Sequence, residues 1–465
     1  MNQTPDQTPD PAPDEVRRPF LRSHAATFKM FSVIILVLLL LIPLGMVRSV
    51  LKERMAGRNA AVAEISSSWG GEQSIVGPVL VVPFTHTVKV WKERTVDGRQ
   101  ERFEVDESRV ASAFFLPDEL NATVAVKPSK LYRGIHEAVV YEAALDLSGR
   151  FSAPDFSRIA TPDATVHWDR AAFTMSVSDL RGTSGILTLD VGGQSHELHP
   201  GSRLPGFDSG ISASFPDPRT LGTGQPFSMH LNLKGSSGLR LAPVGKQNLV
   251  TMTSPWPDPS FKGAFLPARR TVGPQGFDAA WEVSWYGRGY PQESTDVSGD
   301  CALNASAVSG SLFGVDFMSP VDSYRMVERA TKYGVLFISL VFIAFFLFEA
   351  LQSLRIHSIQ YTLVGAALCL FYLGVLALSE FWHFGPAYWT GAAASSLLIV
   401  AYCFSVLRSG RRTGIIAAEL VGIYTYLYVV LQMQDLSLLF GTVLLFVVLG
   451  IVMYATRRLD WAAWE

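Results

Sequence analysis

Apolar residues are distributed very unevenly along this chain of 465 residues. Residues 52–330 have the mixed composition of a protein in water, whereas residues 30–50 and nearly all of the chain after Tyr333 are too apolar to face water. A helix needs about 20 apolar residues to cross a hydrocarbon core about 30 Å thick. The sequence therefore predicts an integral membrane protein with a large water-exposed domain between its first membrane helix and the others.

The first apolar stretch, Met30–Val50, contains no charge before Arg48 and is long enough to span a bilayer. A cleaved signal peptide is the alternative, but it would have a shorter apolar region followed by small residues rather than by charges. The apolar stretches after Tyr333 lack the polar face of helices in a soluble core. These stretches are residues 335–354, 359–379, 386–407, 414–431 and 436–455. We predict six transmembrane α-helices: one at 30–50, and a five-helix bundle at 333–456.

The positions of Lys and Arg predict the orientation. The short loops on one side of the predicted membrane contain Arg355 and Arg408–Arg412, and those on the other side contain no Lys or Arg. Short basic loops favour the cytoplasm, whereas the basic residues beside a long translocated domain carry less weight. We therefore expect residues 51–332 outside the cytoplasm and both termini inside it. The tail at 1–29, rich in Pro and Asp, is expected to be disordered, and 457–465 forms the cytoplasmic C-terminus.

Residues 51–332 have the pattern of a β-rich domain. Apolar and polar residues alternate, with many β-branched residues, in runs that turn-forming residues separate. These runs are residues 78–91, 122–127, 138–147, 172–177, 186–191, 228–233 and 280–285. A short helix, Ala56–Ser68, precedes them and ends at Gly70-Gly71. The expected fold is a large all-β domain resembling an antiparallel sandwich.

Motifs for catalysis are missing from the sequence. His196 and His199 are three residues apart, whereas the helical zinc-protease motif places its histidines four apart. No nucleophile elbow, phosphate-binding loop or dinucleotide fingerprint occurs, and the three cysteines are isolated from one another. No basic run interleaved with aromatic residues suggests nucleic-acid binding. We expect no enzymatic activity, no cofactor, no metal and no nucleic-acid partner.

Three acidic residues near the predicted membrane helices are candidates for function because a charge inside a bilayer is costly. Glu419 lies about five residues into the fifth span, Glu380 at the outer end of the third, and Asp435 between the fifth and sixth. The alternative is that all three lie at headgroup depth, where water reduces the cost. A transporter would give Glu419 a polar partner, whereas an anchor would leave it near Arg411 or Arg412.

The segment Ser254–Phe261 contains three prolines around Trp256. Proline fixes the backbone and removes amide donors, so this segment is predicted to form a rigid loop or a sheet edge rather than a central strand. Trp256 either belongs to a recognition loop or is buried in a structural clasp.

Several segments resemble the CreD family of bacterial inner-membrane proteins. They follow in the same order from about Arg48 to the C-terminus, so chance is a poor explanation. They include residues 55–58, 61–66, 69–83 (WGGEQSIVGPVLVVP), 254–261, 314–324, 348–349 and 456–461. One departure is Gln434, where the family often has an acidic residue, which argues against a paired carboxylate with Asp435.

The resemblance implies an inner (plasma) membrane location, a periplasmic β domain and a role in cell-envelope integrity under envelope stress, including tolerance to wall-directed β-lactams or colicins. It implies no biochemical activity. We expect the chain to be surrounded by the lipid bilayer and the β domain to bind an envelope component or a membrane protein partner. The alternative is a membrane transporter or lipid-handling protein that uses the helix bundle.

Overall fold

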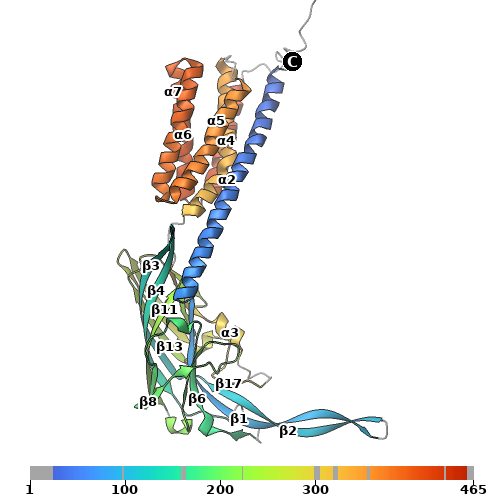
Figure 1. Cartoon of the computed structure of the whole chain (residues 1–465), viewed down its shortest axis with the longest axis vertical. Coiled ribbons are helices and arrows are strands. Elements are labelled where there is room, and N and C mark those ends of the chain that lie inside the picture. The colour runs from blue at the N-terminus through green and yellow to red at the C-terminus, as the bar shows by residue number, and fades with distance from the viewer. Residues whose placement is uncertain are drawn as a thin grey trace, which may run out of the picture. The chain divides into compact units, whose positions relative to one another are not determined.

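The computed structural model describes residues 25–457 apart from 97–98, 158, 160–163, 223, 298–303, 318–322, 353–356 and 434–435. The chain divides into two compact units (Figure 1). One comprises Met1–Gly57 and Asp322–Glu465, and the other comprises Arg58–Val321. The β-rich domain is thus inserted between the first helix and the later ones, as the sequence predicts.

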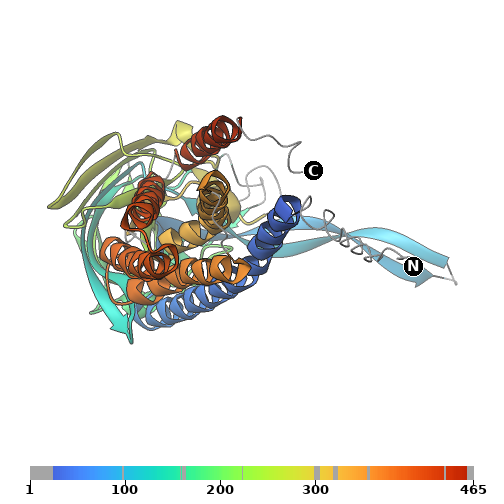
Figure 2. The ribbon, with the colours of Figure 1, turned by 90° about the horizontal axis from the view of Figure 1, so that it is seen from above.

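The first unit consists of helices that run side by side (Figure 2). Among the described residues they are α2 (Ala25–Trp69), α4 (Ser323–Gln352), α5 (Ser358–Ser379), α6 (Phe384–Leu407), α7 (Gly410–Gln432) and α8 (Ser437–Thr456). Five of them, α2 and α4–α7, are long and apolar enough to cross a membrane. The apolar stretch described in α8, Leu439–Tyr454, is shorter. The sixth span therefore stays a prediction.

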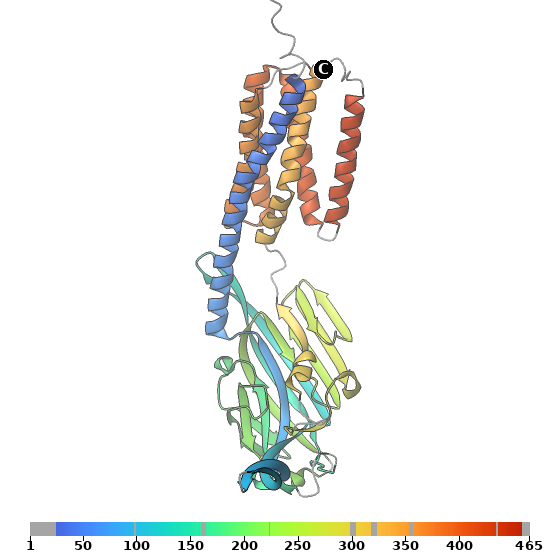
Figure 3. The same ribbon diagram turned by 90° about the vertical axis from the view of Figure 1, so that its right-hand side faces the viewer.

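The helices pack around an apolar core to which α2 and α4–α7 contribute. Gly365 of α5 shows how closely the helices approach, because a Cβ atom there would lie 2.2 Å from the side chain of Leu40 on α2. Small residues at such contacts are typical of helix packing in membranes. In contrast, α8 stands at the edge of this unit (Figure 3), and apolar side chains such as Phe446 and Tyr454 are exposed.

The second unit contains two β-sheets among its described residues. The ten-stranded sheet has the order β14 (Pro259–Gly263), β18 (Phe313–Phe317), β12 (Gly238–Leu241), β1 (Gln73–Val96), β6 (Ala172–Val177), β10 (Gly210–Ser214) and β9 (His199–Pro200), joined by β2 (Arg99–Phe115), β5 (Thr165–Val166) and β17 (Glu293–Thr295). The eight-stranded sheet has the order β15 (Arg269–Gly273), β16 (Gly276–Ser284), β13 (Gln247–Ser254), β3 (Glu119–Arg133), β4 (His136–Phe151), β11 (Gln225–Ser236), β7 (Thr188–Val191) and β8 (Gln194–Glu197).

The two sheets share one hydrophobic core. Phe151 of β4 contacts Phe173 of β6 with ring centroids 4.9 Å apart, and Trp281 of β16 lies 5.7 Å from Phe313 of β18. The predicted two-layer arrangement is therefore present, and each of the predicted runs overlaps a strand. Most strand pairs are antiparallel, as expected for the predicted antiparallel sandwich, but β1 pairs with β12 in parallel and β3 pairs with β13 in parallel. Alternation of side chains reports burial on one face and does not distinguish these two pairings.

The last turns of α2 belong to the second unit and pack on β4. Ile65 contacts Ala138 and Val140 of β4, and the indole N–H of Trp69 donates to the carbonyl oxygen of Tyr141 at 3.4 Å. The helix ends at Trp69, and the next residue, Gly70, has a φ of +129°, which favours glycine. The predicted helix that ends before Gly70 is confirmed.

A long two-stranded ribbon extends from the β unit (Figure 1). β1 and β2 pair from Leu80↔Phe115 to Val96↔Arg99. β5 pairs with β1 only as far out as Thr85, and β17 pairs with β2 only as far out as Ala113. Beyond them, residues 86–96 and 99–109 pair with each other alone among the described strands. We call this part the β1–β2 ribbon.

Candidate functional site

Glu419 lies on α7 with one carboxylate oxygen, Oε1, buried and without a hydrogen-bond partner in the described part of the chain. Cys403 of α6, which is 4% exposed, lies within electrostatic range of this carboxylate. At Oε1, Glu419 therefore shows neither the polar partner expected in a transporter nor a hydrogen bond from Arg411 or Arg412.

Glu380 follows the last turn of α5 and is only 12% exposed. Its Oε1 lies 3.4 Å from Nε of Arg54 on α2, whose side chain is 53% exposed. Ion pairs with such an exposed partner contribute less than about 1 kcal/mol. The contact places the turn between α5 and α6 beside the part of α2 that leads into the β domain. Asp435, the third acidic candidate, lies outside the described residues.

Trp256 lies between β13 and β14. Its ring is partly buried against the core shared by the two sheets, and its indole N–H donates to the carbonyl oxygen of Asp258 at 3.1 Å. β14 is the edge strand of the ten-stranded sheet, as the proline content predicts. The contact with the core favours the structural clasp.

A further buried acidic residue, Glu349 of α4, was not among the predicted candidates. It is 7% exposed, and its Oε2 accepts a hydrogen bond from the hydroxyl of Tyr361 on α5 at 3.0 Å. The Tyr361 ring packs against Phe342 and Phe345 at centroid distances of 5.6 and 6.1 Å. The signal that could have found Glu349 is the one that identified Glu419: an acidic residue within an apolar run.

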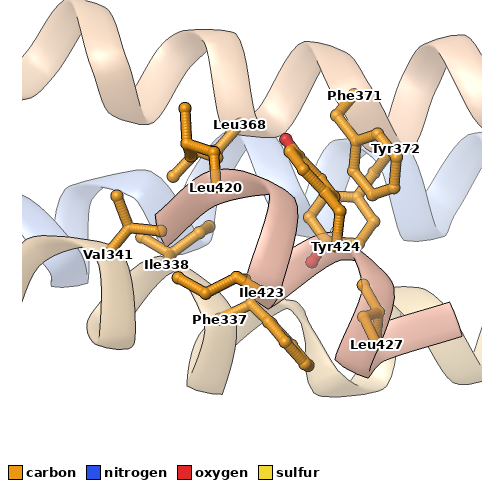
Figure 4. Close-up of a pocket in the computed structure, with 10 residues that line it drawn as sticks. All are labelled: Phe337, Ile338, Val341, Leu368, Phe371, Tyr372, Leu420, Ile423, Tyr424 and Leu427. Carbon is orange, nitrogen blue, oxygen red and sulfur yellow. The ribbon is translucent and has the colours of Figure 1, made fainter. Parts of the chain in front are cut away.

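The centre of the helix bundle holds one small cavity between α4, α5 and α7 (Figure 4). Its volume is about 10 Å³, room for at most a single water molecule. Only two of its lining side chains, Tyr372 and Tyr424, carry a polar atom. The lining residues are Phe337, Ile338, Val341, Leu368, Phe371, Tyr372, Leu420, Ile423, Tyr424 and Leu427.

The buried hydroxyl groups of Tyr388, Ser395 and Tyr424 bind to one another or to backbone. The hydroxyl of Tyr424 and Oγ of Ser395 on α6 are 2.8 Å apart, and the hydroxyl of Tyr388 donates to the carbonyl oxygen of Tyr424 at 2.7 Å. These contacts join α6 to α7 and satisfy the polar atoms locally.

The His and Cys residues of the β domain lie apart from one another where the structure describes them. No cluster of three or more His, Cys, Asp or Glu side chains occurs among the residues with described positions. His196 packs against Phe215 with ring centroids 5.0 Å apart, and His199 is exposed. Of the cysteines, Cys369 and Cys403 are free and buried, whereas Cys301 lies outside the described residues.

Arg288 is buried in the β domain and holds two loops together. Its Nη1 donates to the carbonyl oxygens of Pro243 at 2.9 Å and Val244 at 2.5 Å, and its Nη2 donates to Oε1 of Gln292. Gln292 in turn donates to the carbonyl oxygen of Leu116 at 2.8 Å. Burial lowers the pKa of the Arg288 guanidinium, and burial also raises the pKa of the neighbouring Tyr290 hydroxyl. The hydrogen bonds of this arginine go to carbonyl oxygens, so its role is structural.

Comparison with known proteins identifies the family. The family profile described as "Inner membrane protein CreD" matches residues 25–462. The inner membrane protein CreD of Escherichia coli (strain K12) is 32% identical over 438 residues, which cover 94% of each chain. The chain belongs to the CreD family. It is accordingly an inner membrane protein with several apolar helices.

The segment at 69–83, one of those that resemble the CreD family, has a structural role in this chain. Gln73 is fully buried, and its Nε2 donates to the carbonyl oxygens of Asp179 at 2.9 Å and Lys234 at 2.8 Å. Its Oε1 accepts from Ser178 Oγ at 3.0 Å. Gln73 thus ties the start of β1 to β11 and to the turn after β6, with its amide group satisfied.

Proposed function

We propose that this CreD-family protein is a non-enzymatic inner-membrane protein that supports cell-envelope integrity, and that its β domain binds an envelope component or a protein partner in the periplasm. The helix bundle anchors this domain in the membrane. The family supplies the location, and the distribution of polar and apolar groups in the two units supports the division of roles.

The observation that carries the proposal is the closed interior of the bundle. Small-molecule sites have volumes of about 300–1,000 Å³, and transporter sites lie near the middle of the membrane beside broken helices. The cavity between α4, α5 and α7 is far smaller, about 10 Å³, and almost entirely apolar. Two larger hollows, of about 240 and 260 Å³, lie along α5 and α6, but they are open at the outside of the bundle and are lined by exposed apolar side chains such as Leu370 and Leu398. A bundle of this kind suits an anchor, so binding is assigned to the β domain.

The proposed topology has six spans, with α8 as the sixth, and both termini in the cytoplasm. The absence of Lys and Arg from one set of short loops supports it. The Arg54–Glu380 contact also supports it, because it brings the loop after α5 to the end of α2 that continues into the β domain. Alkaline phosphatase fused after Gly201 or Gly385 should be active, and an inactive fusion at Gly201 would contradict the orientation.

A transporter is the second candidate because Glu349 is a buried carboxylate in the bundle. However, Glu349 lies near the end of α4 at Gln352, and Tyr361 lies near the start of α5 at Ser358. The pair is therefore at one end of the bundle rather than at its middle, where a transport site is expected.

Complementation of an envelope-stress phenotype distinguishes the two functions. One variant replaces residues 59–321 with a flexible linker, and the other carries Glu349→Gln in the intact chain. At matched protein levels, we expect the first to lose function and the second to retain more than half of it. Loss with Glu349→Gln and retention without the β domain would reverse the assignment.

A further inference from the structure

Positively charged residues gather at the end of the helix bundle where α2 continues toward the β domain. On α2 no charge lies between Lys29 and Arg48, and on α4 none lies between Lys332 and Glu349. The guanidinium Nη2 of Arg48 donates to the carbonyl oxygen of Thr331 at 2.8 Å. The apolar parts of the two helices therefore reach the same level at this end of the bundle.

The end of α5 lies close to the same level. A helix rises by about 1.5 Å per residue, so Arg54 lies about 9 Å beyond Arg48 along α2. Its Nε is 3.4 Å from Oε1 of Glu380, which follows the last turn of α5. Trp382, two residues further on, is exposed, and exposed tryptophans are typical of the boundary between membrane and water. We therefore place this layer of the bundle at headgroup depth.

The headgroup layer carries an excess of positive charge. Its described segments 48–57, 323–332 and 380–383 contain six Lys or Arg residues and three Glu residues, so three positive charges are not balanced within these segments. We call the six basic residues the basic collar. They are Arg48, Lys52, Arg54, Arg325, Arg329 and Lys332.

Two members of the basic collar have no acidic partner in the described part of the chain. Lys332 pairs with Glu328 at 2.9 Å, whereas Lys52 and Arg325 are exposed and form no ion pair with another described residue. Ammonium and guanidinium groups are the usual protein ligands of phosphate, and guanidinium can bind it through two parallel hydrogen bonds. Unpaired cations at this depth therefore match the phosphate groups of membrane lipids.

We propose that the basic collar binds the phosphate groups of anionic phospholipids in the leaflet next to the β domain. A zwitterionic lipid also has a phosphate, but its own cation balances that charge. Only a headgroup with a net negative charge neutralises the excess charge of the collar. Clusters of Lys and Arg beside a membrane attract anionic lipids over about one Debye length, about 8 Å at physiological salt.

The bound headgroups hold the part of α2 that leads into the β domain at a fixed depth in the membrane. This role needs only the charge and the depth of the collar, so it holds for either orientation of the chain. It is also separate from binding to an envelope component, so its failure leaves the proposed function intact.

Electron paramagnetic resonance of the full chain in phosphatidylcholine vesicles tests the proposal. The protein should restrict the motion of spin-labelled phosphatidylglycerol about twofold more than that of spin-labelled phosphatidylcholine, because the collar meets only part of the surrounding lipid. Lys52→Gln combined with Arg325→Gln should remove at least about half of this preference, because the two unpaired charges are lost. Lys89→Gln combined with Arg102→Gln changes the charge equally on the β1–β2 ribbon. This matched control should leave the preference unchanged.

Salt and free phosphate give independent readouts. The preference should disappear in NaCl of about 1 M, where the Debye length is about 3 Å. Inorganic phosphate at constant ionic strength should leave it unchanged, and a loss there would overturn the proposal, because the collar would then be a site for a free anion. Equal restriction of the two lipids, or a preference that survives the loss of Lys52 and Arg325, would also overturn it. If the double variant fails to accumulate, Lys52→Gln and Arg325→Gln are measured singly, and each should remove part of the preference.

Discussion

Replacing Trp256 with alanine should destabilise the β domain, because the indole ring covers part of the core shared by the two sheets. A tryptophan side chain can bury 150–250 Å², and a partly buried one loses roughly 100 Å² of apolar contact on truncation to alanine. At about 25 cal/mol per Å², the expected loss of unfolding free energy is about 2–3 kcal/mol. The hydrogen bond to Asp258 is exposed and adds little.

Thermal unfolding of the isolated unit at 58–321, followed by circular dichroism, measures this effect. For a domain of this size, 1 kcal/mol shifts the midpoint by about 2–4 °C, so the expected decrease is about 5–10 °C. Trp91→Ala is the matched control, since Trp91 is 63% exposed on the ribbon and its removal should change the free energy of unfolding by less than about 0.5 kcal/mol. A midpoint unchanged by Trp256→Ala, together with loss of the envelope phenotype, would refute the clasp and favour a recognition loop.

Three further predictions concern polar groups. Glu419→Gln should retain complementation at matched protein level, because its Oε1 has no hydrogen-bond partner to lose; complete loss of function would favour transport. Asp179→Asn should cost about 1 kcal/mol at pH 7, because the charge-assisted hydrogen bond from Arg181 lowers the pKa of Asp179 from its usual 3.8. Because the pKa of Asp179 is lower in the folded state, its charged form stabilises the domain above pH 3.8, and this stabilisation is lost as the pH falls through the folded-state pKa. Denaturant unfolding curves of the unsubstituted protein and of Asp179→Asn should therefore converge below that pKa. Arg288→Met should lower the free energy of unfolding by about 3–5 kcal/mol, because buried carbonyl oxygens lose their donor; a loss below about 1 kcal/mol in denaturant unfolding would contradict this.

The sequence predicts the elements that follow one strong local pattern. Uninterrupted apolar runs identify the helices, and alternation locates strands such as β3, β4 and β11. The strand β2 was not predicted, because charged residues outnumber apolar ones over most of its length and the apolar side chains of its outer part face no core. Strand order also could not be derived, since parallel pairing joins segments more than 100 residues apart, and no local pattern records which segments meet.

The candidate residues show a similar limit. The proline-rich segment around Trp256 was predicted as a loop or edge because proline acts locally. Arg288 looks in sequence like an ordinary surface arginine in a Gly-rich turn, and its burial depends on carbonyl groups from distant loops. Glu349 is different, because the sequence contained the signal and the apolar run was assigned as a span without attention to its one acidic residue.

The parallel pairing of β1 with β12 determines when the β domain can form. β1 is the first strand to leave the ribosome, yet β12, beside it in the sheet, pairs in turn with β18, which ends at Phe317. At about 5–20 residues per second, the ribosome needs roughly 10–50 s to synthesise the chain between these strands. β1 can pair with β2 early, but the part of the sheet that β12 and β18 form is incomplete throughout this interval. Contacts between such distant segments also fold slowly. Chaperones that hold the nascent chain should therefore affect the yield of this protein more than substitutions within any single hairpin.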